Sequence, residues 1–196
     1  MSRIVGARTF PSKKYLSLKV ALGARRKVQY LSLAGQNLEQ LPADIVRLDD
    51  LIYLDLERNA LSELSAHISA LEELEELYSP FNKLKTLPDE LTSLKKLNTL
   101  SLGSNQFTDF PQQVCSCLNL EVLDLGENQI TAVPSCIAAL KKLRIIALNS
   151  NQIRSLPDEF YGLKRLEAIF LKDNPLTLET IKNIQSNFKR ARIILR

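Results

Sequence analysis

The feature that most constrains this chain is a 23-residue repeat that runs without insertion from Val28 to Leu176. When rows of 23 are stacked from Val28, the fourth column is apolar in every row and the ninth is Asn in six of the seven rows. A unit of this length cannot bury an apolar face alone, so neighbouring rows must stack to form a continuous core. The sequence therefore predicts an elongated, repetitive fold.

The apolar columns indicate a short strand in each row. Columns four and six alternate along the chain, which places their side chains on one face of a strand. Column four contains Leu31, Leu54, Leu77, Leu100, Leu123, Ile146 and Ile169. Column nine contains Gln36, Asn59, Asn82, Asn105, Asn128, Asn151 and Asn174. Because an amide side chain both donates and accepts, the repeated Asn predicts a ladder that satisfies backbone groups in the turn after each strand.

The pattern LxxLxLxxNxLxxLP at this period resembles the leucine-rich repeat family. Pro follows column fourteen in five of six rows, and column eighteen is apolar, which is similar to the Ras-suppressor and Scribble type of intracellular repeat. The flanking segments are similar to small bacterial proteins of the same family. The resemblance implies an α/β solenoid with a curved parallel sheet on the concave face. Short helical or 3-10 return arms would lie on the convex face, with a helical cap at each end.

We expect one structural domain in three parts: a basic flank with a capping helix (1–27), seven repeats (28–176), and a capping helix with an edge strand (177–196). Apolar spacing predicts the first helix within 12–24, with Ser12 as a candidate N-cap. The second helix is expected over 177–189, capped by Thr177. Its apolar stripe comprises Leu178, Ile181, Ile184 and Phe188.

Row three departs from the repeat at Ser79 and Pro80, where Ser79 replaces a core Leu. Pro cannot donate a ladder hydrogen bond, so we expect the strand to end or bulge here. Two interpretations remain open: a local adaptation for function, and drift in a tolerant repeat.

Charge is distributed unevenly. Residues 1–27 carry eight Lys or Arg and no acid, and 182–196 carry five more without acid, so 28–181 has a net charge of −9. Nucleic acid is not expected as a partner, because aromatic side chains lie among acids rather than in a basic groove. The basic N-terminal segment leaves an alternative open, in which the protein is a scaffold attached to a membrane surface.

Catalytic chemistry finds little support in the sequence. The single His, His67, falls on the convex side, and Cys115, Cys117 and Cys136 lack the companions of a zinc site. Asp55 and Glu57 share a strand face, but an open sheet offers no pocket that would raise one carboxyl pKa. We therefore expect no catalytic residue, no metal and no cofactor. Three cysteines are too few for a disulfide framework, so free thiols and a cytoplasmic location are expected.

The candidate binding surface lies on the strand face, in columns three, five, seven and eight. Three of the five tyrosines fall there in adjacent rows and are flanked by acids. Exposed aromatic side chains are typical of binding hot spots, although rings can also simply pack on each other along a sheet. The candidate partner-binding residues are Tyr30, Tyr53, Asp55, Glu57, Glu76, Tyr78, Phe81 and Asp124. This surface predicts a non-enzymatic, monomeric protein that binds a protein partner carrying basic and apolar groups. The resemblance implies a signalling scaffold, or a bacterial effector delivered into a host cell.

Overall fold

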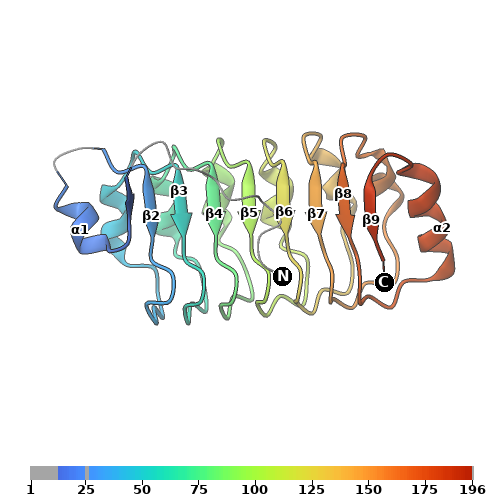
Figure 1. Ribbon diagram of the computed structural model, residues 1–196, viewed down its shortest axis with the longest axis horizontal. Helices are drawn as coiled ribbons and strands as arrows, with labels where there is room; N and C mark the ends of the chain where they lie inside the picture. Colours follow the sequence, from blue (N-terminus) through green and yellow to red (C-terminus); the bar gives the residue numbers. More distant parts are fainter. Residues whose placement is uncertain (1–12, 25–26, 196) are drawn as a thin grey trace.

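The computed structural model describes residues 13–24 and 27–195. They form a solenoid in which nine parallel strands build one open sheet, ordered as in the sequence from β1 to β9 (Figure 1). The return arms lie behind the sheet, and α1 and α2 stand at its two ends (Figure 1). The predicted architecture of a parallel sheet with 3-10 return arms is confirmed.

Each full repeat supplies a three-residue strand and a five-residue 3-10 helix. The strands are β1 (Lys14–Tyr15), β2 (Tyr30–Ser32), β3 (Tyr53–Asp55), β4 (Glu76–Tyr78), β5 (Thr99–Ser101), β6 (Val122–Asp124), β7 (Ile145–Ala147), β8 (Ala168–Phe170) and β9 (Arg192–Ile194). The 3-10 helices are η1 (Ala43–Arg47), η2 (Ala66–Ala70), η3 (Asp89–Ser93), η4 (Gln112–Ser116), η5 (Ser135–Ala139) and η6 (Asp158–Gly162). The α-helices are α1 (Leu18–Leu22) and α2 (Leu178–Asn187). None of the described helices is long and apolar enough to cross a bilayer.

The core is the stack of column-four side chains, and all seven are 0% exposed. Register between strands is constant: Leu31 pairs with Leu54, Leu54 with Leu77, and so on through Ile169. A constant register keeps each apolar side chain in contact with its equivalents in the rows on either side. Residues that are 23 positions apart in the sequence are therefore direct neighbours in the core.

The predicted asparagine ladder is present. Asn82 Oδ1 accepts the Leu61 N–H of the preceding row at 3.0 Å, and its Nδ2 donates to Leu56 O at 2.9 Å. Equivalent bonds recur at Asn59, Asn105, Asn128, Asn151 and Asn174. Gln36, which departs from Asn in the first row, donates instead to Leu16 O beside α1. The ladder thus ties each row to the row before it.

The expected irregularity at Ser79 and Pro80 does not distort the sheet. Strand β4 ends at Tyr78, in the same column where β2 to β8 all end, and Ser79 N–H still donates to Ser101 O. Ser79 is completely buried, and its hydroxyl accepts from Asn82 Nδ2 at 3.1 Å. The strand thus ends here, one of the two expected outcomes, and no bulge forms. In the described rows the column-seven N–H donates to no backbone carbonyl, so a Pro there removes no strand pairing.

The N-terminal cap differs from the expected helix. Lys14 and Tyr15 form a strand that pairs in parallel with β2, and α1 contains only five residues. Tyr15 lies beside Leu31 in the register and is buried, so this strand extends the core and covers an edge that a helix would leave unpaired. Ser12, the candidate N-cap, falls outside the described residues, and Ser17 precedes α1 instead.

At the other end, α2 begins after Thr177, whose hydroxyl accepts the Thr180 N–H at 3.1 Å as expected of an N-cap. Ile184 is fully buried, and Phe188 packs edge-on against Phe160 with 5.7 Å between ring centroids. Leu178, expected on the buried stripe, is 75% exposed. It stands in the first turn, and Thr180 occupies the buried face in its place.

The cysteines also differ from expectation. Cys115 of η4 and Cys136 of η5 form a disulfide between adjacent return arms, 21 residues apart in sequence. Cys117 remains a free thiol and is buried, which raises its pKa to about 11. The expectation of three free thiols is therefore wrong for two of them. Column seventeen of one row lies beside column nineteen of the row before it, an adjacency that a cysteine count does not reveal.

Replacing Asn151 with Ala tests the ladder. Asn151 is 2% exposed, accepts from Ile130 N–H and donates to the carbonyls of Leu125 and Leu148. Its removal leaves the buried Ile130 N–H without its acceptor, whereas each carbonyl keeps one donor, from Asn128 or Asn174. We therefore expect Asn151→Ala to lower the free energy of unfolding by about 2 kcal/mol. Guanidinium denaturation measures the change. The adjacent, exposed Gln152 provides the control, since Gln152→Ala should change stability by less than about 0.5 kcal/mol.

Replacing Cys136 with Ser tests the disulfide. Without the bond, the unfolded chain regains conformational freedom in a loop of this length. We therefore expect the free energy of unfolding of Cys136→Ser to be about 3 kcal/mol lower than that of the wild type, with both proteins kept free of reductant. In the wild type, thiol alkylation after denaturation should label one cysteine before reduction and three after it. Three labelled cysteines without reduction would show that the bond does not form.

Candidate functional site

The strand face of the sheet is the surface formed by columns three, five, seven and eight of the repeats, opposite the 3-10 helices (Figure 1). Its first rows carry the aromatic side chains that the sequence singled out. Tyr30, Tyr53 and Tyr78 form a continuous row, with ring centroids 6.3 Å apart for the first pair and 5.2 Å for the second. Tyr30 is buried, Tyr53 and Tyr78 are half-buried, and Phe81 is 40% exposed. The rings thus pack on each other, and Phe81 presents the largest aromatic surface.

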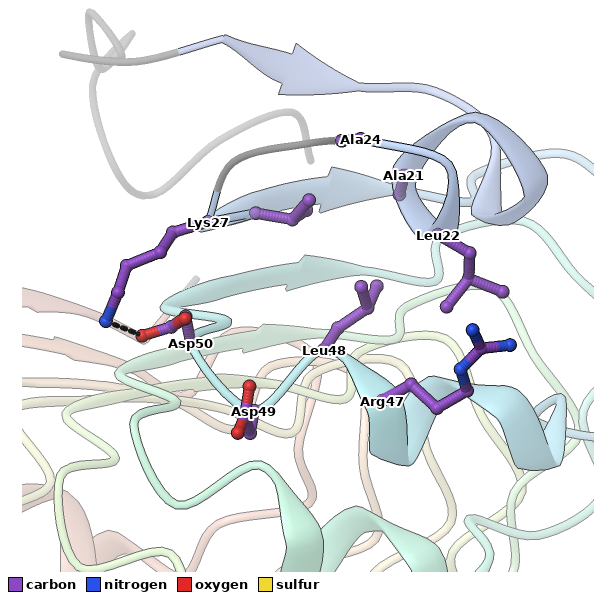
Figure 2. Close-up of a pocket in the computed structure, with 9 residues that line it drawn as sticks. Ala21, Leu22, Ala24, Lys27, Arg47, Leu48, Asp49 and Asp50 are labelled. Carbon is purple, nitrogen blue, oxygen red and sulfur yellow. Dashed lines mark hydrogen bonds and ion pairs between the residues drawn. The ribbon is translucent and has the colours of Figure 1, made fainter.

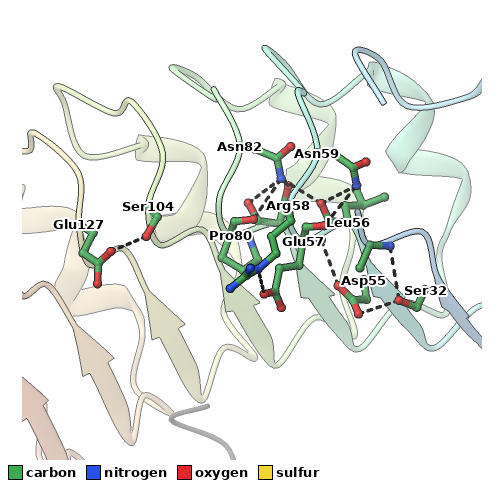
Figure 3. A network of polar contacts seen from close by, with 12 residues as sticks. Ser32, Asp55, Leu56, Glu57, Arg58, Asn59, Pro80, Asn82, Ser104 and Glu127 are labelled. Carbon is green, nitrogen blue, oxygen red and sulfur yellow. Dashed lines mark hydrogen bonds and ion pairs between the residues drawn. The ribbon is translucent and has the colours of Figure 1, made fainter. Parts of the chain in front are cut away.

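The acids among these rings are less accessible than expected. Asp55 and Glu76 are 9% and 3% exposed. Asp55 accepts hydrogen bonds from Ser32 Oγ at 2.8 Å and from Glu57 N–H at 3.0 Å, as Figure 3 shows. Glu76 accepts from the Tyr78 hydroxyl at 3.0 Å. These contacts use the two carboxylates to hold neighbouring side chains in place. The other two expected acids, Glu57 and Asp124, are half-buried.

Two cations that the sequence analysis did not select lie within this surface. Lys14 Nζ is 3.7 Å from Asp55 Oδ2 and 4.9 Å from the centroid of the Tyr53 ring. The Arg58 guanidinium is 4.9 Å from the Phe81 ring centroid and is paired with Glu57 at 3.0 Å (Figure 3). Arg58 could have been found, because it precedes Phe81 by one period in the same column. Lys14 lies outside the repeat, so nothing in the pattern placed it here.

Phe81 has a backbone conformation that is costly for its residue type. Column eight is left-handed in all seven rows, with φ between 52° and 67°. The other members of the column are small or polar: Gly35, Arg58, Ser104, Glu127, Ser150 and Asp173. A bulky residue at positive φ carries a conformational cost. Phe81 bears that cost without burying its ring.

Asp124 stands three rows from Asp55 in the same column. It accepts Gly126 N–H at 3.0 Å and Ser101 Oγ–H at 3.2 Å. Burial raises the pKa of this carboxyl above its usual value of 3.8, against the effect of both hydrogen bonds, and the negative charge of Glu127 adds to the rise. The structure therefore does not bring Asp124 to the aromatic row, but places it in a separate polar cluster.

Other candidate sites offer less. A pocket of about 460 Å³ lies between α1 and the segment after η1, where Leu22 and Leu48 line it and Lys27 is paired with Asp50 (Figure 2). Its lining charges suggest no nucleophile or acid–base pair.

His67 is exposed and contacts Ser65. Within 13–24 and 27–195, no three His, Cys, Asp or Glu side chains converge as metal ligands. Four of the eight Lys and Arg of the basic N-terminal segment lie outside those ranges, so the described residues do not test the membrane alternative.

Comparison with known proteins agrees with the repeat pattern. A family model described as leucine rich repeat matches residues 72–130 and 119–176, together more than half of the chain. No curated protein matches the sequence.

Three solved structures illustrate the similarity. A Leptospira interrogans leucine-rich repeat protein has a TM-score of 0.73 and 26% identity, covering 94% of this chain and 58% of that one. The ectodomain of the Arabidopsis thaliana receptor kinase GASSHO1/SCHENGEN3, in complex with CASPARIAN STRIP INTEGRITY FACTOR 2, has a TM-score of 0.72 and 28% identity, covering 86% and 21%. The plant peptide hormone receptor RGFR1, in complex with RGF2, has a TM-score of 0.68 and 27% identity, covering 86% and 28%. The chain thus spans less than two thirds of each of these proteins.

Replacing Asp124 with Asn tests the electrostatics of its cluster. A carboxyl whose pKa is raised by folding binds protons more tightly in the native state, so its contribution to stability is lost as pH rises from its unfolded to its folded pKa. We therefore expect Asp124→Asn to gain stability relative to the wild type as pH rises through that window to neutrality. Thermal unfolding between pH 3 and 7 measures the difference. A constant difference across this range would contradict the assignment.

Proposed function

Because the chain belongs to the leucine-rich repeat family, we propose that it is a non-catalytic protein-binding module that engages a protein partner through its strand face. The observation that carries the proposal is Phe81, an exposed ring held at φ 55° with the Arg58 guanidinium over it. Nothing about the core requires an aromatic residue there, since Gly or Ser occupies the column in other rows. A preformed aromatic surface with a polar rim is typical of a binding hot spot.

The relatives support a binding role of this kind. Both plant receptor structures were solved in complex with a named factor, CASPARIAN STRIP INTEGRITY FACTOR 2 in one and RGF2 in the other. A rigid solenoid suits such binding, because a surface held in place by its fold loses little conformational entropy when a partner docks. We propose that the partner contributes apolar side chains to Phe81 and Tyr78, and basic groups to the acids on the same face.

The disulfide bears on where this binding takes place. A bond between Cys115 and Cys136 favours an oxidising compartment over the cytoplasm expected from the cysteine count. The thiol measurement on protein isolated from its native cell distinguishes the two locations. Whether the module acts as a scaffold or as an effector then follows from the identity of its partner.

The test compares affinity capture by the full chain and by Phe81→Asn. Asn tolerates positive φ better than Phe, so the variant should be as stable as the wild type or more stable by up to about 1 kcal/mol. We expect Phe81→Asn to capture at least tenfold less of the partner that the wild type captures. The triple variant Tyr53/Tyr78/Phe81→Ala should abolish capture.

Leu118 provides the matched control, because it is 59% exposed and follows η4 on the opposite side of the solenoid. Capture by Leu118→Asn should equal that of the wild type. If Phe81→Asn and the triple variant fold normally and retain full capture, the strand face is not the binding surface and the proposal fails.

A further inference from the structure

The first residues of this chain have the composition that the strand face is proposed to bind. Residues 1–12 lie outside the described part of the chain, and their sequence contains no acid. They carry two basic side chains and several apolar ones, among them Arg3, Arg8, Ile4, Val5 and Phe10. Basic and apolar groups are what we propose for the partner of the strand face. The chain therefore supplies, directly before β1, a segment with the chemistry of that partner.

The strand face carries the opposite charge. Columns three, five, seven and eight hold six acids and two bases over the seven repeats. The acids are Asp55, Glu57, Glu76, Asp124, Glu127 and Asp173. Such a face attracts a segment with two arginines. Because the segment is tethered to the sheet, its local concentration at the face is high and weak attraction is enough to hold it there.

Strand β1 joins this segment to the edge of the strand face. Lys14 belongs to β1, the first strand of the sheet, but its side chain reaches the third strand. Its Nζ is 3.7 Å from Asp55 Oδ2 and 4.9 Å from the centroid of the Tyr53 ring. One cation from outside the repeats is thus already bound by an acid and an aromatic ring of this face, at the point where residues 1–12 begin to lead away.

The outward-facing column three is buried over the first strands and more accessible over the last. Tyr30 in β2, Glu76 in β4 and Thr99 in β5 are buried, although their side chains point away from the core. The column-three residues of β6, β7 and β8 are half-buried. Burial of a carboxylate such as Glu76 is costly unless positive or hydrogen-bonding groups accompany it. A basic segment over the first strands accounts for both the burial and its compensation.

The segment is long enough to cross these strands. Twelve extended residues span up to about 40 Å, and six adjacent strands at about 4.8 Å spacing place β6 about 24 Å from β1. The electrostatics of β6 agree with this reach. The positive charge of the chain's N-terminus lowers the pKa of Asp124, in opposition to the effect of burial on the same carboxyl.

We propose that residues 1–12 dock on the strand face as an intramolecular ligand that runs from β1 towards β6. Arg3 and Arg8 provide its charge, and Ile4, Val5 and Phe10 its apolar contacts. This docking is independent of any partner. Its consequence rests on the proposed function: the segment covers the surface that the partner needs, so the apparent affinity for the partner falls with the fraction of chains in which the face is open.

A nitroxide at position 2 of the full, ¹⁵N-labelled chain measures docking by NMR. Ser2→Cys supplies the attachment site, because Cys115 and Cys136 are bonded and the buried Cys117 has a pKa of about 11. We expect the relaxation enhancement at the Gly126 N–H to be at least fivefold that at the Ala139 N–H. Ala139 is the matched control, since it lies in η5 of the same repeat, on the opposite side of the sheet. Equal enhancement at both groups would overturn the docking.

A mixed sample identifies the occupant. When the nitroxide and the ¹⁵N label are on different molecules, the difference between Gly126 and Ala139 should disappear. An enhancement at Gly126 as large as in the doubly labelled chain would assign the face to the segment of a second copy and overturn an intramolecular ligand.

Variants of the two arginines test the charge. Arg3→Gln/Arg8→Gln should lower the enhancement at Gly126 at least threefold, because both positive charges are removed. Arg3→Lys/Arg8→Lys keeps the charges and should retain more than half of the enhancement. Circular dichroism confirms that both variants fold. An enhancement that is unchanged in the Gln variant would overturn the electrostatic basis of the docking.

The consequence for binding is tested with the partner that the wild type captures. We expect Arg3→Gln/Arg8→Gln to capture at least threefold more of it, since the face is open in a larger fraction of chains. Arg3→Lys/Arg8→Lys should capture as much as the wild type. Unchanged capture by a Gln variant whose docking is lost would overturn the inhibitory role. The relaxation measurement needs no partner, so docking and the proposed function of the strand face can fail separately.

Discussion

Every element of this protein depends on stacking identical positions of neighbouring repeats. A three-residue strand cannot persist alone, and the column-four side chains become fully buried only because the rows above and below supply the remaining contacts. The asparagine ladder adds the polar counterpart, since each amide satisfies backbone groups of its own row and of the row before it. Apolar stacking and amide bonding repeat with the same period, so they enforce one register along the whole sheet.

This arrangement leaves the strand face with unusual freedom. The side chains of columns four and six, the ladder and the return arms bury the core, so columns three, five, seven and eight can vary without loss of the fold. Pro80 illustrates the tolerance, because it stands in column seven, whose N–H donates to no backbone carbonyl in the described rows. The cost of Phe81 at positive φ is not explained by folding, since Gly or Ser occupies the same column in other rows. It is the reason we propose binding there.

The sequence predicted the fold well because its signal is repeated seven times, and a single irregular row cannot obscure it. The site was predicted less completely. Periodicity correctly placed Tyr53, Tyr78 and Phe81 on one face, but it could not show that Tyr30, Asp55 and Glu76 would be covered by their neighbours. Exposure depends on the sizes and conformations of side chains in adjacent rows. Lys14 was missed for a related reason, since it reaches Asp55 from a strand outside the repeat.

The sequence by itself determined the number of repeats, the parallel sheet, the Asn ladder and the face available for binding, because each follows from which residue occupies which column. Only the tertiary structure decided contacts between different columns and between the flanks and the array. The Cys115–Cys136 bond joins columns nineteen and seventeen, and β1 replaces part of an expected helix at the sheet edge. The Asn149 amide lies over Gly126 in the preceding row. Such contacts depend on how far one row is displaced against the next, a three-dimensional quantity that a one-dimensional period does not contain.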